Sequence, residues 1–156
     1  MTKLERDIKR ATGYGDISRP KPAKKRNPRK SAVNAADKWA SLDVRLDNQC
    51  VLADKHTCKG MIVCGHLFSR IAYSTRWNES NLYPICSYSN IAMENDPVVA
   101  RQLLEYAESL WGEVAIAELY RLYRSAVPVK TFEIQEHAEI WHGKYIKHCE
   151  WRGVEA

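Results

Sequence analysis

Two short stretches with the composition of β-strands limit what this chain can fold into. The first, residues 60–68, is apolar and partly β-branched, and the second, residues 81–85, is shorter. A helix is predicted directly behind the second, over residues 86–92. The remaining elements have helical patterns, so the sequence predicts an α+β fold in which a small ββα core is embedded in a mainly helical domain.

Gly65 lies inside the first predicted strand and is followed by His66. A glycine lets the backbone turn or approach another group closely. We therefore expect the strand to break at Gly65 and the imidazole of His66 to point away from it.

Helical patterns lie on both sides of the strands. The predicted helices cover residues 31–46, 96–111, 113–125 and 131–151. Ser31 is the expected N-cap of the first, and Asp96 with Pro97 begins the second. The residues expected to face inward on the third are Val114, Ala117, Leu119, Tyr120 and Tyr123. The long C-terminal helix has a continuous apolar seam, formed by Ile134, Ala138, Trp141, Tyr145 and Cys149.

Residues 1–30 are predicted to form a flexible basic arm before one domain of residues 31–156. Residues 19–30 contain three prolines, no acidic residue and no large apolar side chain, so they cannot build a core. Basic side chains in such an arm can bind DNA phosphates, and the alternative is a solvated linker that only aids solubility. The candidate DNA-binding residues are Lys24, Lys25, Arg26, Arg29 and Lys30.

The charge balance favours a polyanionic partner. The 156 residues have a formal net charge of +5, which fits nucleic acid better than a membrane, because no run approaches the ~18 apolar residues of a spanning helix. No apolar stretch near Met1 resembles a signal peptide, so we expect a cytoplasmic protein. Five cysteines, an odd number without regular spacing, argue against a disulfide framework.

One set of polar residues has the order that phosphodiester cleavage requires. This reaction needs a base, a cation that stabilises charge, and groups that hold the phosphate. His66 is the candidate base, Asn81 would orient its ring, and Asn90 would bind Mg²⁺ or Mn²⁺ through its amide oxygen. Arg70 and Arg76 would hold the phosphate.

Each of these residues also has a structural interpretation. A histidine beside a strand glycine is often a hydrogen-bonded structural residue, and asparagines are common in turns and caps. The order of His66, Asn81 and Asn90 in a basic chain favours the nuclease interpretation.

The runs Gly-His-Leu-Phe-Ser-Arg at residues 65–70 and Ser-Thr-Arg-Trp-Asn-Glu-Ser-Asn-Leu-Tyr-Pro-Ile-Cys at residues 74–86, with Asn90 and Asn95, resemble the phage NinG/Rap recombination-nuclease family of the HNH superfamily. The resemblance extends from Ser31 to the end. It implies an HNH-like ββα-metal core and an endonuclease that cuts branched DNA in phage recombination, in the host cytosol. Asn95 becomes a second candidate metal ligand, and resolution of Holliday junctions would favour a homodimer.

The cysteines depart from this family, which usually holds a structural zinc ion with two Cys-x-x-Cys pairs. Here Cys58 and Cys86 each remain from one of these pairs, and the other cysteine of each pair is missing. We therefore expect no structural zinc, and the substitute ligand set that stays open is Cys50, His56, Cys58 and Cys86.

Two other functions remain alternatives to the nuclease. The chain could be a non-catalytic DNA-binding or accessory protein with a decayed HNH fold, as the incomplete cysteine pairs would allow. It could also be a scaffold that forms oligomers through the apolar seam of the C-terminal helix.

Overall fold

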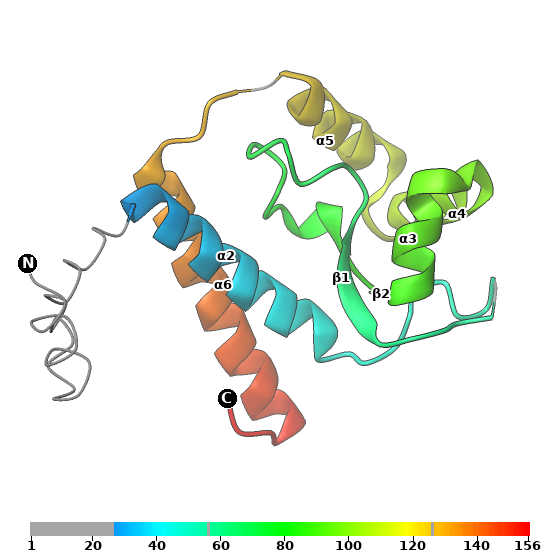
Figure 1. Cartoon of the computed structure of the whole chain (residues 1–156), viewed down its shortest axis with the longest axis horizontal. Coiled ribbons are helices and arrows are strands. Elements are labelled where there is room, and N and C mark those ends of the chain that lie inside the picture. The colour runs from blue at the N-terminus through cyan, green and yellow to red at the C-terminus, as the bar shows by residue number, and fades with distance from the viewer. Residues whose placement is uncertain (1–26, 56, 126) are drawn as a thin grey trace, which may run out of the picture.

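The computed structural model describes residues 27–55, 57–125 and 127–156. Its elements are, in order, α2 (Pro28–Arg45), β1 (Ile62–His66), the 3₁₀ turn η1 (Glu79–Asn81), β2 (Leu82–Cys86), α3 (Ser87–Asn95), α4 (Pro97–Trp111), α5 (Glu113–Ser125) and α6 (Thr131–Arg152). The small sheet lies between the α2–α6 pair and the group α3, α4 and α5 (Figure 1). The α+β prediction and the long C-terminal helix are confirmed.

Helix α2 begins earlier than its sequence pattern indicates. The side chain of Asn27 accepts hydrogen bonds from the backbone N–H groups of Arg29 and Lys30, and Pro28 occupies the first helical position, where no N–H donor is needed. Arg29 and Lys30 therefore belong to the helix and not to an arm. The other predicted DNA-binding residues of the arm, Lys24, Lys25 and Arg26, lie outside the described residues.

Helices α2 and α6 pack side by side along their length (Figure 1). The face of α2 toward this contact is made of small residues four positions apart, Ala32, Ala36 and Ala40, which lets the helices approach closely. Trp141 of the α6 seam is 3 % exposed, and its indole N–H donates to the carbonyl of Trp77 over 2.9 Å. The seam is thus covered by the chain's own core, so a scaffold would need a different surface.

Strands β1 and β2 form an antiparallel hairpin in which Gly65 lies opposite Tyr83 and His66 opposite Leu82. The predicted break at Gly65 is wrong, because β1 continues through it to His66. The glycine is needed for space. A Cβ atom there would lie 2.2 Å from Cδ1 and 2.6 Å from Cγ1 of Ile85, which is fully buried, and 3.4 Å from Oδ1 of Asn90.

We expect Gly65→Ala to lower the free energy of unfolding by about 1–3 kcal/mol, because the core around Ile85 must shift to admit the methyl group. Urea unfolding measures this change. The matched control is Gly143→Ala in α6, where an added Cβ meets nothing within 4 Å and alanine should stabilise the helix by about 0.5–1 kcal/mol. If the two substitutions change the free energy of unfolding by similar amounts, the close approach of Ile85 to Gly65 would be contradicted.

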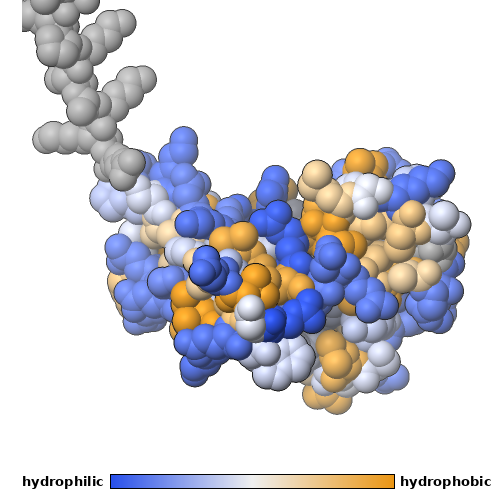
Figure 2. Space-filling view, turned by 90° about the horizontal axis from the view of Figure 1, so that it is seen from below, coloured by the Kyte–Doolittle hydropathy of each residue, from blue (hydrophilic) through white to orange (hydrophobic). Residues whose placement is uncertain are grey.

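The hairpin separates two hydrophobic clusters. Leu82 belongs to the cluster with α2 and α6, whereas Tyr83 and Ile85 belong to the cluster with α4 and α5. On the face seen in Figure 2, the exposed hydrophobic residues also fall into separate groups with hydrophilic residues between them. On α5, Leu119 faces inward as predicted, but Val114, Ala117 and Tyr120 are exposed, so that part of the prediction is wrong.

Candidate functional site

His66 ends β1 and lines two cavities. One, of about 460 Å³, lies between α2 and the hairpin, and the other, of about 420 Å³, lies between the hairpin and α3. Arg70, in the loop after β1, lines both cavities as well. The imidazole of His66 and the guanidinium group of Arg70 are therefore shared by two cavities with different linings.

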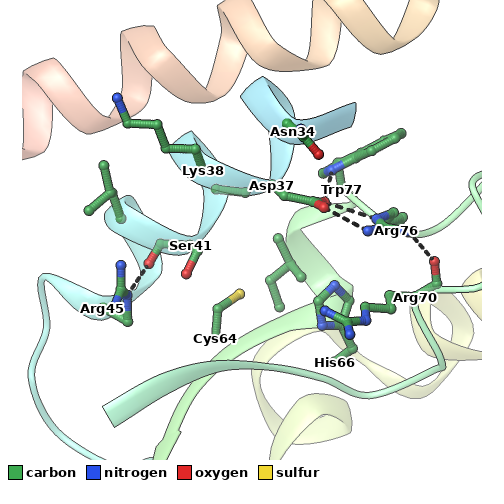
Figure 3. Close-up of a pocket in the computed structure, with 13 residues that line it drawn as sticks. Asn34, Asp37, Lys38, Ser41, Arg45, Cys64, His66, Arg70, Arg76 and Trp77 are labelled. Atoms are coloured by element: carbon green, nitrogen blue, oxygen red, sulfur yellow. Dashed lines mark hydrogen bonds and ion pairs between the residues drawn. The ribbon is translucent and has the colours of Figure 1, made fainter. Parts of the chain in front are cut away.

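Most of the charged residues that line the first cavity are cations (Figure 3). Its acidic side chain, Asp37 of α2, accepts two hydrogen bonds from Arg76, at 2.9 Å from Nε and 2.6 Å from Nη2, and one from the indole of Trp77 at 2.9 Å. The charge of Asp37 is thus largely used within the protein. The charged lining residues outside this ion pair are Lys38, Arg45 and Arg70, all cations, so the cavity suits an anion such as phosphate.

The two predicted phosphate-binding arginines differ in their surroundings. Besides its fork with Asp37, Arg76 donates from Nη1 to the carbonyl of Arg70 over 3.0 Å, so three of its five N–H donors are engaged. Arg70 is exposed and reaches both cavities. Arg70 is therefore the better placed to bind a substrate phosphate, and Arg76 holds the loop and supplies fixed positive charge.

Asn81 is fully buried, and its amide bonds to the loop after β1. Its Oδ1 accepts from the backbone N–H of Phe68 at 2.7 Å, while its Nδ2 donates to the carbonyls of Phe68 at 3.1 Å and Thr75 at 3.0 Å. Both amide hydrogens are used in this way. Asn81 therefore fixes the two ends of the loop that contains Arg70, instead of orienting the ring of His66 directly as the sequence led us to expect.

The second cavity contains oxygen ligands from α3. Asn90 lines it together with His66, and so does Glu94, which lies one helical turn after Asn90 on the same face. Sequence reasoning missed Glu94, although its spacing of four residues from Asn90 was a usable signal. Asn95, the other predicted ligand, is exposed and donates to the carbonyl of Ile91 at 3.2 Å, away from the residues that line this cavity.

The pKa of His66 is lowered to about 4. Burial is the largest cause and the positive charges of Arg76 and Arg70 act in the same direction, whereas Asp37 and a hydrogen bond to the backbone of Arg76 oppose them. The imidazole is therefore neutral at pH 7 and has a lone pair that can accept a proton. This state is the one that a general base requires.

The low pKa of His66 predicts a pH dependence of stability. Below the ordinary histidine pKa of 6.5 the unfolded chain takes up a proton, whereas the folded chain does so only near pH 4. The free energy of unfolding should therefore fall as the pH drops from 6.5 to 4, by up to about 1.4 kcal/mol per pH unit from this residue.

Urea unfolding at pH 7 and pH 4.5 checks this prediction, with His66→Gln as the comparison. Other groups titrate in both proteins, so the loss of stability should be smaller in the variant. An equal loss in the two proteins would contradict the lowered pKa.

Three cysteines from separate parts of the sequence meet beside the second strand. The Sγ atoms of Cys50, Cys58 and Cys86 all lie within 4.8 Å of one another. His56, the fourth member of the substitute set, lies outside the described residues. Three sulfur ligands at this separation could hold a metal ion, and thiolates are common ligands of zinc.

The thiol of Cys86 has the electrostatics of a metal ligand. Burial acts to raise its pKa, but hydrogen bonds from the hydroxyl and backbone N–H of Ser89, from the backbone of Lys59 and from Cys58 outweigh burial and lower the pKa to about 6. Burial and the contacts with Cys50 and Cys86 raise the pKa of Cys58 to about 12. Because metals bind the thiolate, a thiol that ionises near neutral pH binds them readily.

Comparison of the chain with protein-family models, with curated proteins and with solved structures found no match. In the described part of the chain, no helix combines the length and apolar character that crossing a membrane requires.

Proposed function

We propose that this protein is a metal-dependent endonuclease that hydrolyses phosphodiester bonds in branched or partly single-stranded DNA. The observation that carries the proposal is the position of His66, which lines a cavity rich in guanidinium groups and a cavity with the side-chain oxygens of Asn90 and Glu94. A base, a phosphate-binding group and a cation site are the three requirements of the reaction.

The residues of the chain divide the work of the reaction among them. Arg70 binds oxygens of the scissile phosphate, and Arg76, braced by Asp37, adds positive charge from a fixed position. His66 accepts the proton of the attacking water. A bound phosphate offsets the charges of Arg70 and Arg76, so it raises the pKa of His66 toward its ordinary value and makes the ring a stronger base when substrate is present.

A hard cation, Mg²⁺ or Mn²⁺, fits the second cavity because amide and carboxylate oxygens are the ligands that such ions prefer. Asn90 and Glu94 would hold it from successive turns of α3. When bound, the cation stabilises the charge that develops on the phosphate and on the leaving oxygen.

The proposal is tested by incubating purified protein with nicked, flapped and four-way DNA, and with plain duplex, in Mg²⁺ or Mn²⁺. We expect cleavage of the branched substrates to be faster than that of the duplex. Symmetric cuts in a four-way junction would require two active sites. Light scattering on the complex should then give the mass of one junction plus two protein chains. DNA binding without cleavage in either cation would contradict the enzyme and favour the non-catalytic DNA-binding protein.

We also propose that Cys50, Cys58 and Cys86 hold a structural zinc ion. Protein purified without chelator should contain about one zinc per chain, and removal of the metal should lower the melting temperature, because the ion links residues 50–58 to the start of α3. Cys50→Ser should lower the zinc content. Cys149→Ser, in α6 and outside the cluster, should retain it. Metal-free protein with an unchanged melting temperature after chelation would contradict the zinc site.

A further inference from the structure

A further cavity, of about 490 Å³, lies beside the loop that follows β1. Its walls come from the N-terminal end of α2, residues 71–74 of the loop, the C-terminal end of α5 and residues 127–129. The reaction proposed above does not use this space. It shares the loop with the phosphate-binding cavity, since Arg70 and Arg76 lie at the two ends of residues 71–74.

The lining of this cavity combines flat and aliphatic groups with positive charge. Tyr73 and Tyr123 contribute aromatic rings, and Ala72 and Val129 belong to its aliphatic wall. Among the described lining residues, the charged ones are Arg29 and Arg124, both cations. A ligand that suits this combination is flat, largely apolar on its faces and attached to an anion, as a nucleotide is.

A chain of contacts joins this cavity to the phosphate-binding site. The guanidinium carbon of Arg29 lies 5.0 Å from the centroid of the Tyr73 ring, and that of Arg76 lies 5.4 Å from the same centroid. The two carbons are therefore at most 10.4 Å apart, the total of these two distances. A stacked DNA strand rises about 3.4 Å per nucleotide, so a strand bound at Arg76 reaches the cavity within about three nucleotides.

Two further features suit an unpaired nucleotide. Arg29 is held in place, because its Nη1 donates to the carbonyl of Val129 over 2.8 Å. Ile71, next to Arg70 in the chain, is 82 % exposed although it is a large apolar side chain. Proteins that bind the minor groove frequently insert apolar side chains between neighbouring bases. Ile71 is exposed enough to do so, and Asn81 holds the ends of its loop.

We propose that this cavity binds an unpaired nucleobase close to the phosphate that Arg70 binds beside the fixed charge of Arg76, with Arg124 on the adjoining backbone. The inference rests on the proposed function, whose substrate class it narrows to DNA with an unpaired nucleotide near the cut. Ile71 keeps that nucleotide out of the stack.

Binding by the His66→Ala protein in Mg²⁺ tests the inference without cleavage. The probes are two oligonucleotide duplexes of equal length and sequence context, one with a bulged 2-aminopurine and one with the same base paired. We expect the bulged probe to bind at least about tenfold more tightly, from the stacking free energy of one base, and its fluorescence to change on binding. Equal affinity for both probes would overturn the inference.

Two substitutions locate the effect. Ala72→Phe fills the cavity and Arg124→Ala removes an exposed cation, and in the same His66→Ala background each should reduce the preference for the bulged probe by about fivefold or more. The matched controls on the outer face of α5, Ala117→Phe and Arg121→Ala, should retain the preference. If Ala72→Phe does not fold, Arg124→Ala decides, and a preference unchanged in Arg124→Ala would overturn the inference.

The outcomes separate this inference from the proposed function. Preference for the bulged probe, with no DNA cleaved by the wild-type protein, would support the nucleobase site and contradict the enzyme. Cleavage by the wild-type protein, with no preference between the probes, would support the enzyme and contradict the nucleobase site.

Discussion

We expect His66→Ala to lower the rate of DNA cleavage by about 10²–10⁴-fold while DNA affinity stays close to that of the wild-type protein. The imidazole is the proton acceptor of the proposed reaction, whereas the DNA contacts come from Arg70 and the other cations of the cavity. The variant should also fold, because the ring of His66 is only partly buried and belongs to neither hydrophobic cluster. Single-turnover cleavage in Mg²⁺ and a separate binding titration measure the two effects.

The matched control for this variant is His142→Ala. His142 is exposed on α6 and stacks on Trp39 with the ring centroids 4.1 Å apart, so it lies outside both cavities that His66 lines. Its removal should leave the cleavage rate unchanged. A full rate in His66→Ala, or an equal loss in both variants, would show that His66 is not the base.

Asn81→Asp should lower the free energy of unfolding by about 3–5 kcal/mol, although the two side chains have the same shape. The carboxylate still accepts from the N–H of Phe68, but its second oxygen replaces an NH₂ group that donates to the carbonyls of Phe68 and Thr75. Two hydrogen bonds are lost and a charge is buried against two carbonyl oxygens. Urea unfolding measures the cost, and cleavage should fall as well, because the loop contains Arg70.

Asn78→Asp is the matched control for that substitution. Asn78 caps η1, and its Oδ1 accepts from the N–H and the hydroxyl of Ser80, so an aspartate oxygen serves equally well. Its stability should change by less than about 0.5 kcal/mol. If Asn81→Asp unfolds at the same urea concentration as Asn78→Asp, Asn81 does not anchor the loop.

Local signals explain which parts of the fold the sequence could predict. Helix α4 begins at Pro97 after Asp96 and ends before Gly112, as predicted, because a cap, a proline and a glycine with φ of 86° act within their own turns. The start of α2 was predicted too late. Pro28 was interpreted as part of an extended arm, yet at the first helical position proline favours the helix.

The site was predictable where neighbours in the sequence determine it. His66 and Asn90 line one cavity because the hairpin and the following helix bring them together. The partners of Asn81 and Arg76 could not be predicted, because the bonds depend on tertiary packing. Arg76 binds Asp37, which lies 39 residues earlier and on another element. Cys50, Cys58 and Cys86, by contrast, belong to the substitute ligand set that the sequence leaves open, and the structure brings their Sγ atoms together.

The hydrogen bond from Trp141 to the carbonyl of Trp77 also bears on when the site is completed during synthesis. It joins residues 64 positions apart, and α6 is translated after every other element that forms the site. A nascent chain that already contains His66, Arg70 and Asn90 still lacks the helix that covers Trp77 and closes the cluster of α2. Because contacts between residues far apart in the sequence form late in folding, we expect the cluster around Trp77 and α2 to be completed only once α6 has been made.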